Sequence, residues 1–178
     1  NENITFISYY FYPYKEVGAK RVTYWANNLY KYSNYDVTVY TSTIQKSFVD
    51  LSKNNNLKIV RIKAPFNNPL IWALKIVPIL IKSFYTRKSI YILSGGPFGF
   101  FYLTYLIKLF GSKVILDFRD PYAKNPLHNV SFYKRILKTL YEYLVCLPAD
   151  KIITVNRYCG KLICASQNKI SYIDNGYD

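Results

Sequence analysis

The chain has 178 residues, enough for one domain with a buried core, and a formal net charge of +14. Hydrophobic residues make up 51% and charged residues 19%, which excludes a disordered chain. The positive charge leaves three kinds of partner open, namely nucleic acid, an anionic membrane surface and phosphorylated substrates, against the alternative of a solvated basic surface.

The segments with a clear hydrophobic period are strands and helices in alternation. Val22, Trp25, Ala26 and Leu29 recur at spacings of three and four, which predicts an amphipathic helix. Pro78 lies within another helical segment and should kink it. The predicted strands cover 4–8, 37–40, 57–62, 90–93, 114–116, 151–155 and 170–173. The predicted helices cover 19–32, 69–85, 98–110, 132–147 and 156–165. The polar stretch 41–56 is expected to be a loop.

This alternation predicts βαβ units. The strands are uniformly apolar, as expected when helices cover both faces of a sheet. We therefore expect an α/β fold, a doubly wound, mostly parallel Rossmann-like sheet of about seven strands with helices on both faces. Residues 1–178 show no internal repeat and are expected to form a single domain. Because a turn signal, Asn175-Gly176, follows the last strand directly, we expect this domain to be cut at a domain boundary.

Histidine and cysteine are scarce. His128 is the only histidine, and Cys146, Cys159 and Cys164 form no C-x-x-C pair, so the sequence predicts neither a metal site nor a disulfide framework. The N-terminus lacks the features of a signal peptide, and no apolar run reaches the ~18 residues of a membrane span. We therefore expect reduced thiols and a cytoplasmic location.

Two loops with glycine follow predicted strands. In Glu16–Arg21, Gly18 lies just before a helix whose start could hold a phosphate, with Arg21 adding charge. The alternative is that Gly18 serves a turn. No G-x-G-x-x-G or P-loop pattern occurs. In Ser94–Gly99, Gly95 and Gly96 precede Pro97, which we expect in the first helical turn beside exposed N–H groups. An anion or sugar site is one interpretation, and a compact turn is the other.

A third loop carries three ionisable residues after a buried strand. Asp117, Arg119 and Asp120 lie in the run KVILDFRDP. Asp120 is the best candidate for a general base, and Arg119 could hold an anion. The alternative is an ion-pair cluster that only fixes the loop. Because carboxyl ends of parallel strands meet at one sheet edge, the three loops together predict a site there.

Five segments in order resemble the N-terminal domain of family-4, GT-B-type glycosyltransferases. They are YYFYPYKEVGAKR with YDVTVYTS, SGGPFG, LDFRDPY, ADKIITVNRY and NKISYIDNGYD. The paired glycines of the family's first loop are Val17-Gly18 here, which departs from the pattern. The resemblance implies the acceptor-side half of a retaining, nucleotide-sugar-dependent enzyme of bacterial cell-surface polysaccharide or glycolipid synthesis, inactive without its donor-binding half.

The resemblance also implies roles for residues. Gly18 and Arg21 would meet the donor diphosphate. Gly95, Gly96 and Asp117 would face the acceptor, and Arg119 and Asp120 the reacting sugar. No cofactor or metal is expected, since the nucleotide sugar is a substrate. In a lone domain, we expect Asp117, Arg119 and Asp120 to face open solvent.

The partners implied are a nucleotide sugar, a sugar or lipid-linked acceptor, and peripheral contact with an anionic membrane. The segment 69–88 is the predicted membrane-binding helix, because its apolar residues are accompanied by Lys75, Lys82, Arg87 and Lys88, with core packing as the alternative. A membrane-recruiting binding subunit remains an alternative function. A nucleic-acid-binding protein is disfavoured, because no RRM, KH or helix-turn-helix pattern occurs.

Overall fold

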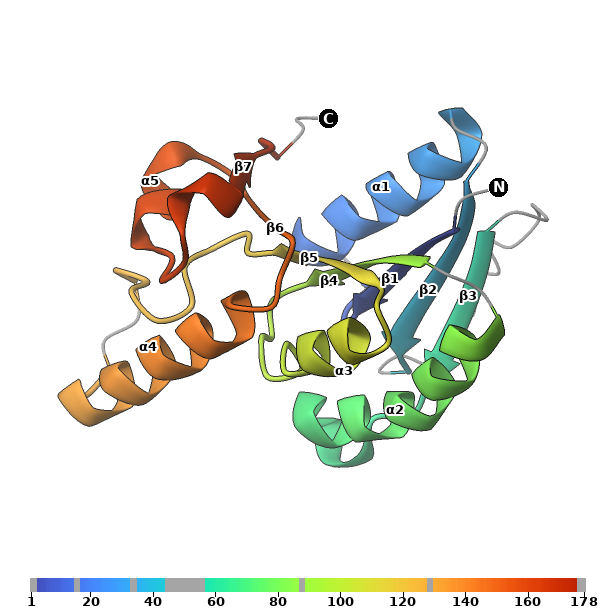
Figure 1. Cartoon of the computed structure of the whole chain (residues 1–178), viewed down its shortest axis with the longest axis horizontal. Coiled ribbons are helices and arrows are strands. Elements are labelled where there is room, and N and C mark those ends of the chain that lie inside the picture. The colour runs from blue at the N-terminus through green and yellow to red at the C-terminus, as the bar shows by residue number, and fades with distance from the viewer. Residues whose placement is uncertain are drawn as a thin grey trace.

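The computed structural model describes residues 3–14, 17–32, 35–43, 57–86, 89–127 and 130–175. Its centre is a seven-stranded sheet in the order β3-β2-β1-β4-β5-β6-β7, with every neighbouring pair parallel (Figure 1). The strands are β1 Asn3–Ser8, β2 Asp36–Ser42, β3 Leu57–Ile62, β4 Ser89–Ser94, β5 Lys113–Asp117, β6 Lys151–Thr154 and β7 Ile170–Tyr172. This confirms the predicted α/β class with a parallel sheet of seven strands.

The helices connect these strands in chain order. They are α1 Val17–Tyr32, α2 Pro69–Thr86, α3 Leu103–Leu109, α4 Phe132–Cys146 and α5 Arg157–Leu162. Two short 3₁₀ turns, η1 Pro65–Asn67 and η2 Gln167–Lys169, complete the described elements. Helix α2 includes Pro78 and is a single element of 18 residues.

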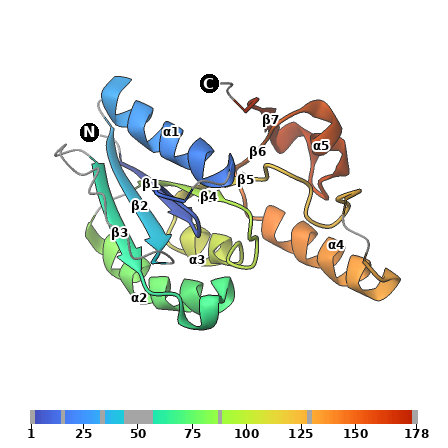
Figure 2. The ribbon, with the colours of Figure 1, turned by 180° about the vertical axis from the view of Figure 1, so that it is seen from behind.

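Helices cover both faces of the sheet (Figure 2). On one face, Val22 and Ala26 of α1 are buried in a cluster with Phe6 and Val39. On the other face, α2 and α3 supply a larger cluster that includes Trp72, whose ring meets those of Tyr9 and Phe100 edge-on. The apolar residues that recur at helical spacing in α1 and α2 are therefore buried against the sheet.

The strand order reverses beside β1, which pairs with β2 on one side and with β4 on the other. In an open α/β sheet, ligands bind outside the carboxyl ends of the strands at such a switch point. Because β1 and β4 are parallel neighbours, the segments that follow them, beginning at Tyr9 and Gly95, both leave the sheet at this edge.

The predicted helix 98–110 is wrong at its start, because α3 begins only at Leu103. Gly96 has a φ of +86°, and the chain from Phe98 onward forms successive turns closed by bonds such as Phe101 N–H to Phe98 O. The ring of Phe98 stacks on that of Phe118 at 5.2 Å. Aromatic packing thus fixes a turn segment where the apolar run predicts a helix.

Several predicted features lie outside the described residues, namely His128, Glu16, Arg87, Lys88, Gly176 and the stretch 44–56. In the part of the chain that the structure describes, no helix has the length and apolarity required to cross a membrane. The same residues contain no cluster of three or more His, Cys, Asp and Glu side chains that could hold a metal ion.

Candidate functional site

A buried polar cluster lies beneath the switch point, at the ends of β4 and β5. Asp117 has no exposed surface, and its Oδ2 accepts a hydrogen bond of 2.7 Å from the hydroxyl of Ser94. Its Oδ1 lies 3.4 Å from Nη2 of Arg21 in an ion pair that is buried on both sides. Burial raises the pKa of Asp117, while Arg21, Ser94 and Arg119 act to lower it.

Arg21 connects three parts of the fold from its place in α1. Its Nη1 donates to the carbonyl of Asp174 at 3.3 Å and to Oδ1 of Asn175 at 2.8 Å, both in the segment after β7. Its guanidinium lies 4.2 Å from the ring centroid of Trp25. With only 6% of its surface exposed, Arg21 is placed to hold the fold together around Asp117.

Arg119 lies above this cluster, against the start of α1. Its Nε donates to the carbonyl of Gly95 at 2.9 Å, and its Nη2 donates to the carbonyls of Gly95 and Gly96. The guanidinium also fills the space that a side chain on Gly18 would occupy. The structure therefore brings Gly18, Gly95, Gly96 and Arg119 together, as their positions at the strand ends predict.

This geometry differs in one respect from the expected glycine site. The carbonyl groups of Gly95 and Gly96, not their N–H groups, face Arg119. Helix α3 has only seven residues and starts well after Pro97, so it offers no helix start at this loop. The positive groups of the site are the guanidinium of Arg119 and the first turn of α1, and both favour an anion.

The three ionisable residues after β5 differ in exposure. Asp120 is exposed, Arg119 is half-buried and Asp117 is fully buried. The expectation that all three face open solvent is wrong for Asp117, because Ser94 and Arg21 enclose its carboxylate. Asp117 can therefore influence a bound molecule only through its neighbours, whereas Asp120 can touch one directly.

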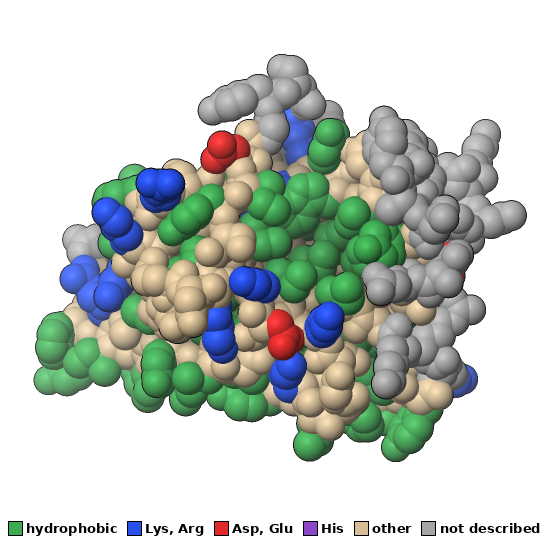
Figure 3. All heavy atoms as spheres, turned by 45° about the horizontal axis from the view of Figure 1, so that its top comes forward, with side chains coloured by type: hydrophobic (Ala, Val, Ile, Leu, Met, Phe, Trp, Pro, Cys, Tyr) green, Lys and Arg blue, Asp and Glu red, His purple; other side chains and the backbone are tan. Residues whose placement is uncertain are grey.

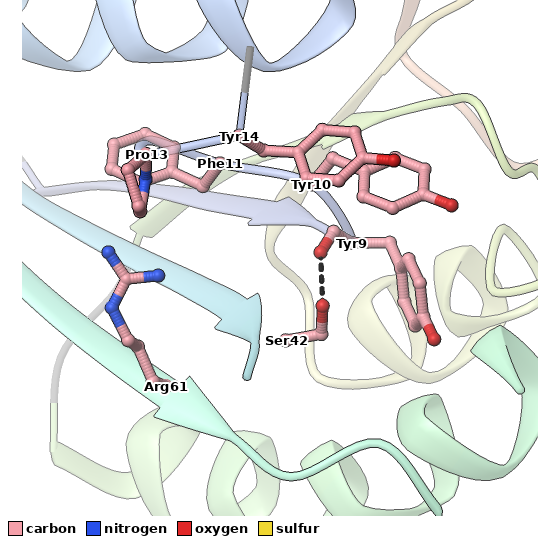
Figure 4. Close-up of a pocket in the computed structure, with 7 residues that line it drawn as sticks. All are labelled: Tyr9, Tyr10, Phe11, Pro13, Tyr14, Ser42 and Arg61. Atoms are coloured by element: carbon pink, nitrogen blue, oxygen red, sulfur yellow. Dashed lines mark hydrogen bonds between the residues drawn. The ribbon is translucent and has the colours of Figure 1, made fainter. Parts of the chain in front are cut away.

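A small aromatic pocket lies beside this site, at the carboxyl ends of β1, β2 and β3 (Figure 4). The rings of Tyr10 and Tyr14 stack at 4.4 Å, and Nη2 of Arg61 donates to the carbonyl of Tyr12 at 2.6 Å. The hydroxyl of Ser42 donates to the carbonyl of Tyr9 at 2.5 Å. The cavity of about 20 Å³ holds roughly one water molecule.

Sequence reasoning assigned no role to this pocket. The signal for it was the aromatic run after the first strand, Tyr9 to Tyr14, in which four of six residues are tyrosine. For Arg61 the only signal was a charged residue in a strand, LKIVRI, whose other residues apart from Lys58 are apolar.

Glu142 of α4 holds the loop that carries Arg119 and Asp120. It is fully buried, and its carboxylate accepts hydrogen bonds from three backbone N–H groups, those of Tyr122, Ala123 and Cys164, at 2.6–3.0 Å. Since these donors come from two loops, Glu142 fixes the path of the chain after the candidate base. Sequence reasoning missed it, because its partners are distant in the chain.

Solved structures with a similar fold share little sequence with this chain. UGT2 from Phytolacca americana, complexed with UDP-2-fluoro-glucose and pterostilbene, has a TM-score of 0.57 and 10% identity, covering 88% of this chain and 48% of UGT2. TcCGT1 in complex with UDP has a TM-score of 0.60 and 8% identity, covering 92% and 46%. A protein assigned as a UDP-N-acetylglucosamine 2-epimerase from Listeria monocytogenes has a TM-score of 0.57 and 9% identity, covering 94% and 43%.

At these identities the likeness shows the fold alone. The chain spans less than half the length of each of these three proteins. No family model matches the sequence, and no curated protein matches it.

Proposed function

We propose that this chain is the N-terminal, acceptor-side half of a retaining, nucleotide-sugar-dependent glycosyltransferase of the GT-B fold. The observation that carries the proposal is the meeting of Arg119 with the first turn of α1 at Gly18, at the switch point of the sheet. The likeness of the fold to two proteins solved with UDP or a UDP-sugar supports the same class of ligand.

In this proposal the donor diphosphate binds at the start of α1. The helix N-terminus and Arg119 both stabilise negative charge, which grows on the diphosphate as its bond to the sugar breaks. Arg119 replaces Arg21 as the side chain that meets the donor, because Arg21 is buried and paired with Asp117. The role of Arg21 is then to hold Asp117 and the end of β5 in place.

The acceptor lies over the Gly95–Gly96 loop and beside Asp120. Its hydroxyl oxygen forms a bond to the anomeric carbon while the bond from that carbon to the diphosphate breaks. The hydroxyl proton passes either to the departing diphosphate or to the exposed carboxylate of Asp120. No metal takes part, and the site works at the cytoplasmic face of a membrane on a sugar or lipid-linked acceptor of bacterial cell-surface synthesis.

Nucleotide binding to this chain tests the donor site without requiring turnover. We expect UDP or inorganic pyrophosphate to bind in calorimetric titrations, and Arg119→Ala to weaken that binding about tenfold. Lys82→Ala on the exposed side of α2 is the matched control for loss of one positive charge. Equal affinity of the Arg119 variant and the wild type would remove Arg119 from the donor site.

The role of Asp120 is tested in a protein that contains this domain and transfers sugar. Asp120→Asn keeps the size of the side chain and removes its basicity. Turnover equal to that of the wild type would assign the proton to the diphosphate and take Asp120 out of the chemistry.

A further inference from the structure

Helix α4 exposes apolar side chains along its whole length. Seven of them are between 41% and 78% exposed, and they are Phe132, Tyr133, Ile136, Leu137, Leu140, Tyr143 and Leu144. In the space-filling view, hydrophobic side chains gather at the lower left, where α4 projects from the sheet, with Lys and Arg side chains beside them (Figure 3). An exposed apolar surface of this extent marks an interaction site.

These side chains form one continuous face. At 100° per residue, these side chains fall within an arc of about 140°, with Phe132 at one edge and Leu137 at the other. The opposite side of α4 meets the rest of the fold through Glu142, Val145 and Cys146, all buried. One face of the helix therefore packs against the core, and no described residue covers its second, apolar face.

The charge beside this face is positive. Lys134 and Arg135 are exposed and lie on either side of the apolar arc, and Lys138 lies 4.9 Å from the ring centroid of Tyr122. The only acidic residue of α4 is Glu142, which is buried. A two-fold contact between copies would set each patch against itself and gather the cations of both at one interface. The charge therefore favours an anionic occupant over a second copy.

The same helix also borders an apolar groove. The groove has a volume of about 440 Å³ and is lined by residues of α4 that include Phe132, Ile136 and Leu140, with Arg135 at its side and Cys164 across from the helix. An apolar space beside a guanidinium matches a molecule with a hydrocarbon part and an anionic part.

Helix α2, in which the sequence placed the membrane contact, has a different environment. Its apolar residues Trp72, Ala73, Ile76 and Leu80 are all buried against the sheet. Core packing therefore accounts for this side of α2. Its outer side exposes Leu70, Leu74 and Tyr85 together with Lys75 and Lys82, which is a smaller apolar surface than that of α4.

We propose that α4 lies in the surface of an anionic lipid bilayer. Its exposed apolar face lies among the acyl chains, and Lys134 and Arg135 lie at the headgroups. The inference deepens the membrane contact of the proposed function and rests on it, but it does not depend on nucleotide binding. An amphipathic helix of this kind gains from both buried apolar area and attraction to anionic lipid.

Flotation of the purified chain with vesicles tests the proposal. Vesicles of phosphatidylglycerol with phosphatidylcholine should carry the wild type at low salt, and binding should fall as salt rises. Leu137→Ser with Leu140→Ser should weaken the binding about tenfold, and Lys134→Gln with Arg135→Gln about fivefold or more. Leu70→Ser with Leu74→Ser is the matched control on α2, since these leucines are 52% and 59% exposed.

Each result has a defined meaning. Loss of flotation in both α4 variants with retention in the α2 variant supports the proposal. Absence of wild-type flotation at low salt, or equal loss in the α2 and α4 variants, overturns it. A dimer seen by sedimentation that the leucine variant of α4 dissolves, without vesicle binding, replaces the lipid by a second copy. UDP titration of the same variants shows separately whether the donor site is intact.

Discussion

The guanidinium of Arg119 occupies the space that a side chain at Gly18 would need. The two residues are 101 positions apart in the chain, and the strand order β1-β4-β5 brings them to one edge of the sheet. A cation and the N-terminus of a helix repel each other. Their close approach therefore adds little to the stability of the fold, but it creates a positive site that suits an anion.

Gly18→Ala should therefore displace Arg119 and weaken UDP binding about tenfold. The added methyl group takes the place of the guanidinium, which must leave the carbonyl of Gly95. Calorimetric titration of the variant measures the loss. Adding Arg119→Ala should cause little further loss, because both changes remove the same contact. Losses that simply add would show that the two residues act independently.

Asp117→Ala should destabilise the fold by about 3–5 kcal/mol, because it leaves Arg21 buried without its partner. The hydroxyl of Ser94 loses its acceptor in the same change. Urea unfolding followed by circular dichroism measures the effect. Arg21→Met with Asp117→Leu should cost less than the single change, since no charge remains buried. A single variant as stable as the wild type would contradict the role given to the pair.

Glu142→Gln should destabilise the fold by about 2–4 kcal/mol. In the wild type, both carboxylate oxygens accept hydrogen bonds from backbone N–H groups. In the variant, an NH₂ group replaces one of these oxygens, so that donor faces donor. Urea unfolding again gives the size of the loss, with Asp120→Asn as a control at an exposed carboxylate. Equal stability of the two variants would remove Glu142 as the anchor of the loop.

Asp150→Asn should cost about 1 kcal/mol at neutral pH and much less near pH 3. Burial acts to raise the pKa of Asp150, but hydrogen bonds from Lys108 and from the N–H of Val114 outweigh it and lower the pKa. A carboxyl group whose pKa is lower in the folded state adds stability at pH values above its pKa in the unfolded chain, about 3.9. That stability is lost as the pH falls through the pKa of the folded state. Unfolding curves at both pH values check this, and a difference that persists in acid would refute it.

The hydrophobic period predicted the sheet well, since strand 57–62 has the predicted bounds and the others differ by one to three residues. Local pattern failed at residues 98–102, where the positive φ of Gly96 and the stacking of Phe98 on Phe118 hold turns in an apolar run. That outcome depends on a ring twenty residues away, which a local window cannot contain.

The candidate site was predictable in position but not in detail. The strand ends placed Gly18, Gly95 and Arg119 at one edge. Whether Arg21 or Arg119 would be buried depends on which of them reaches Asp117, and the spacing of residues does not determine that. Similarly, the period of 132–147 predicted a helix but could not show that one of its two apolar faces would remain uncovered.

The bonds from Arg21 to Asp174 and Asn175 join positions 153 and 154 residues apart. During synthesis, the guanidinium of Arg21 therefore lacks these two hydrogen-bond partners until the segment after β7 has left the ribosome. Contacts between such distant positions form late in folding. Strands β1 to β4 must therefore pack together before Arg21 has bonded to the segment after β7.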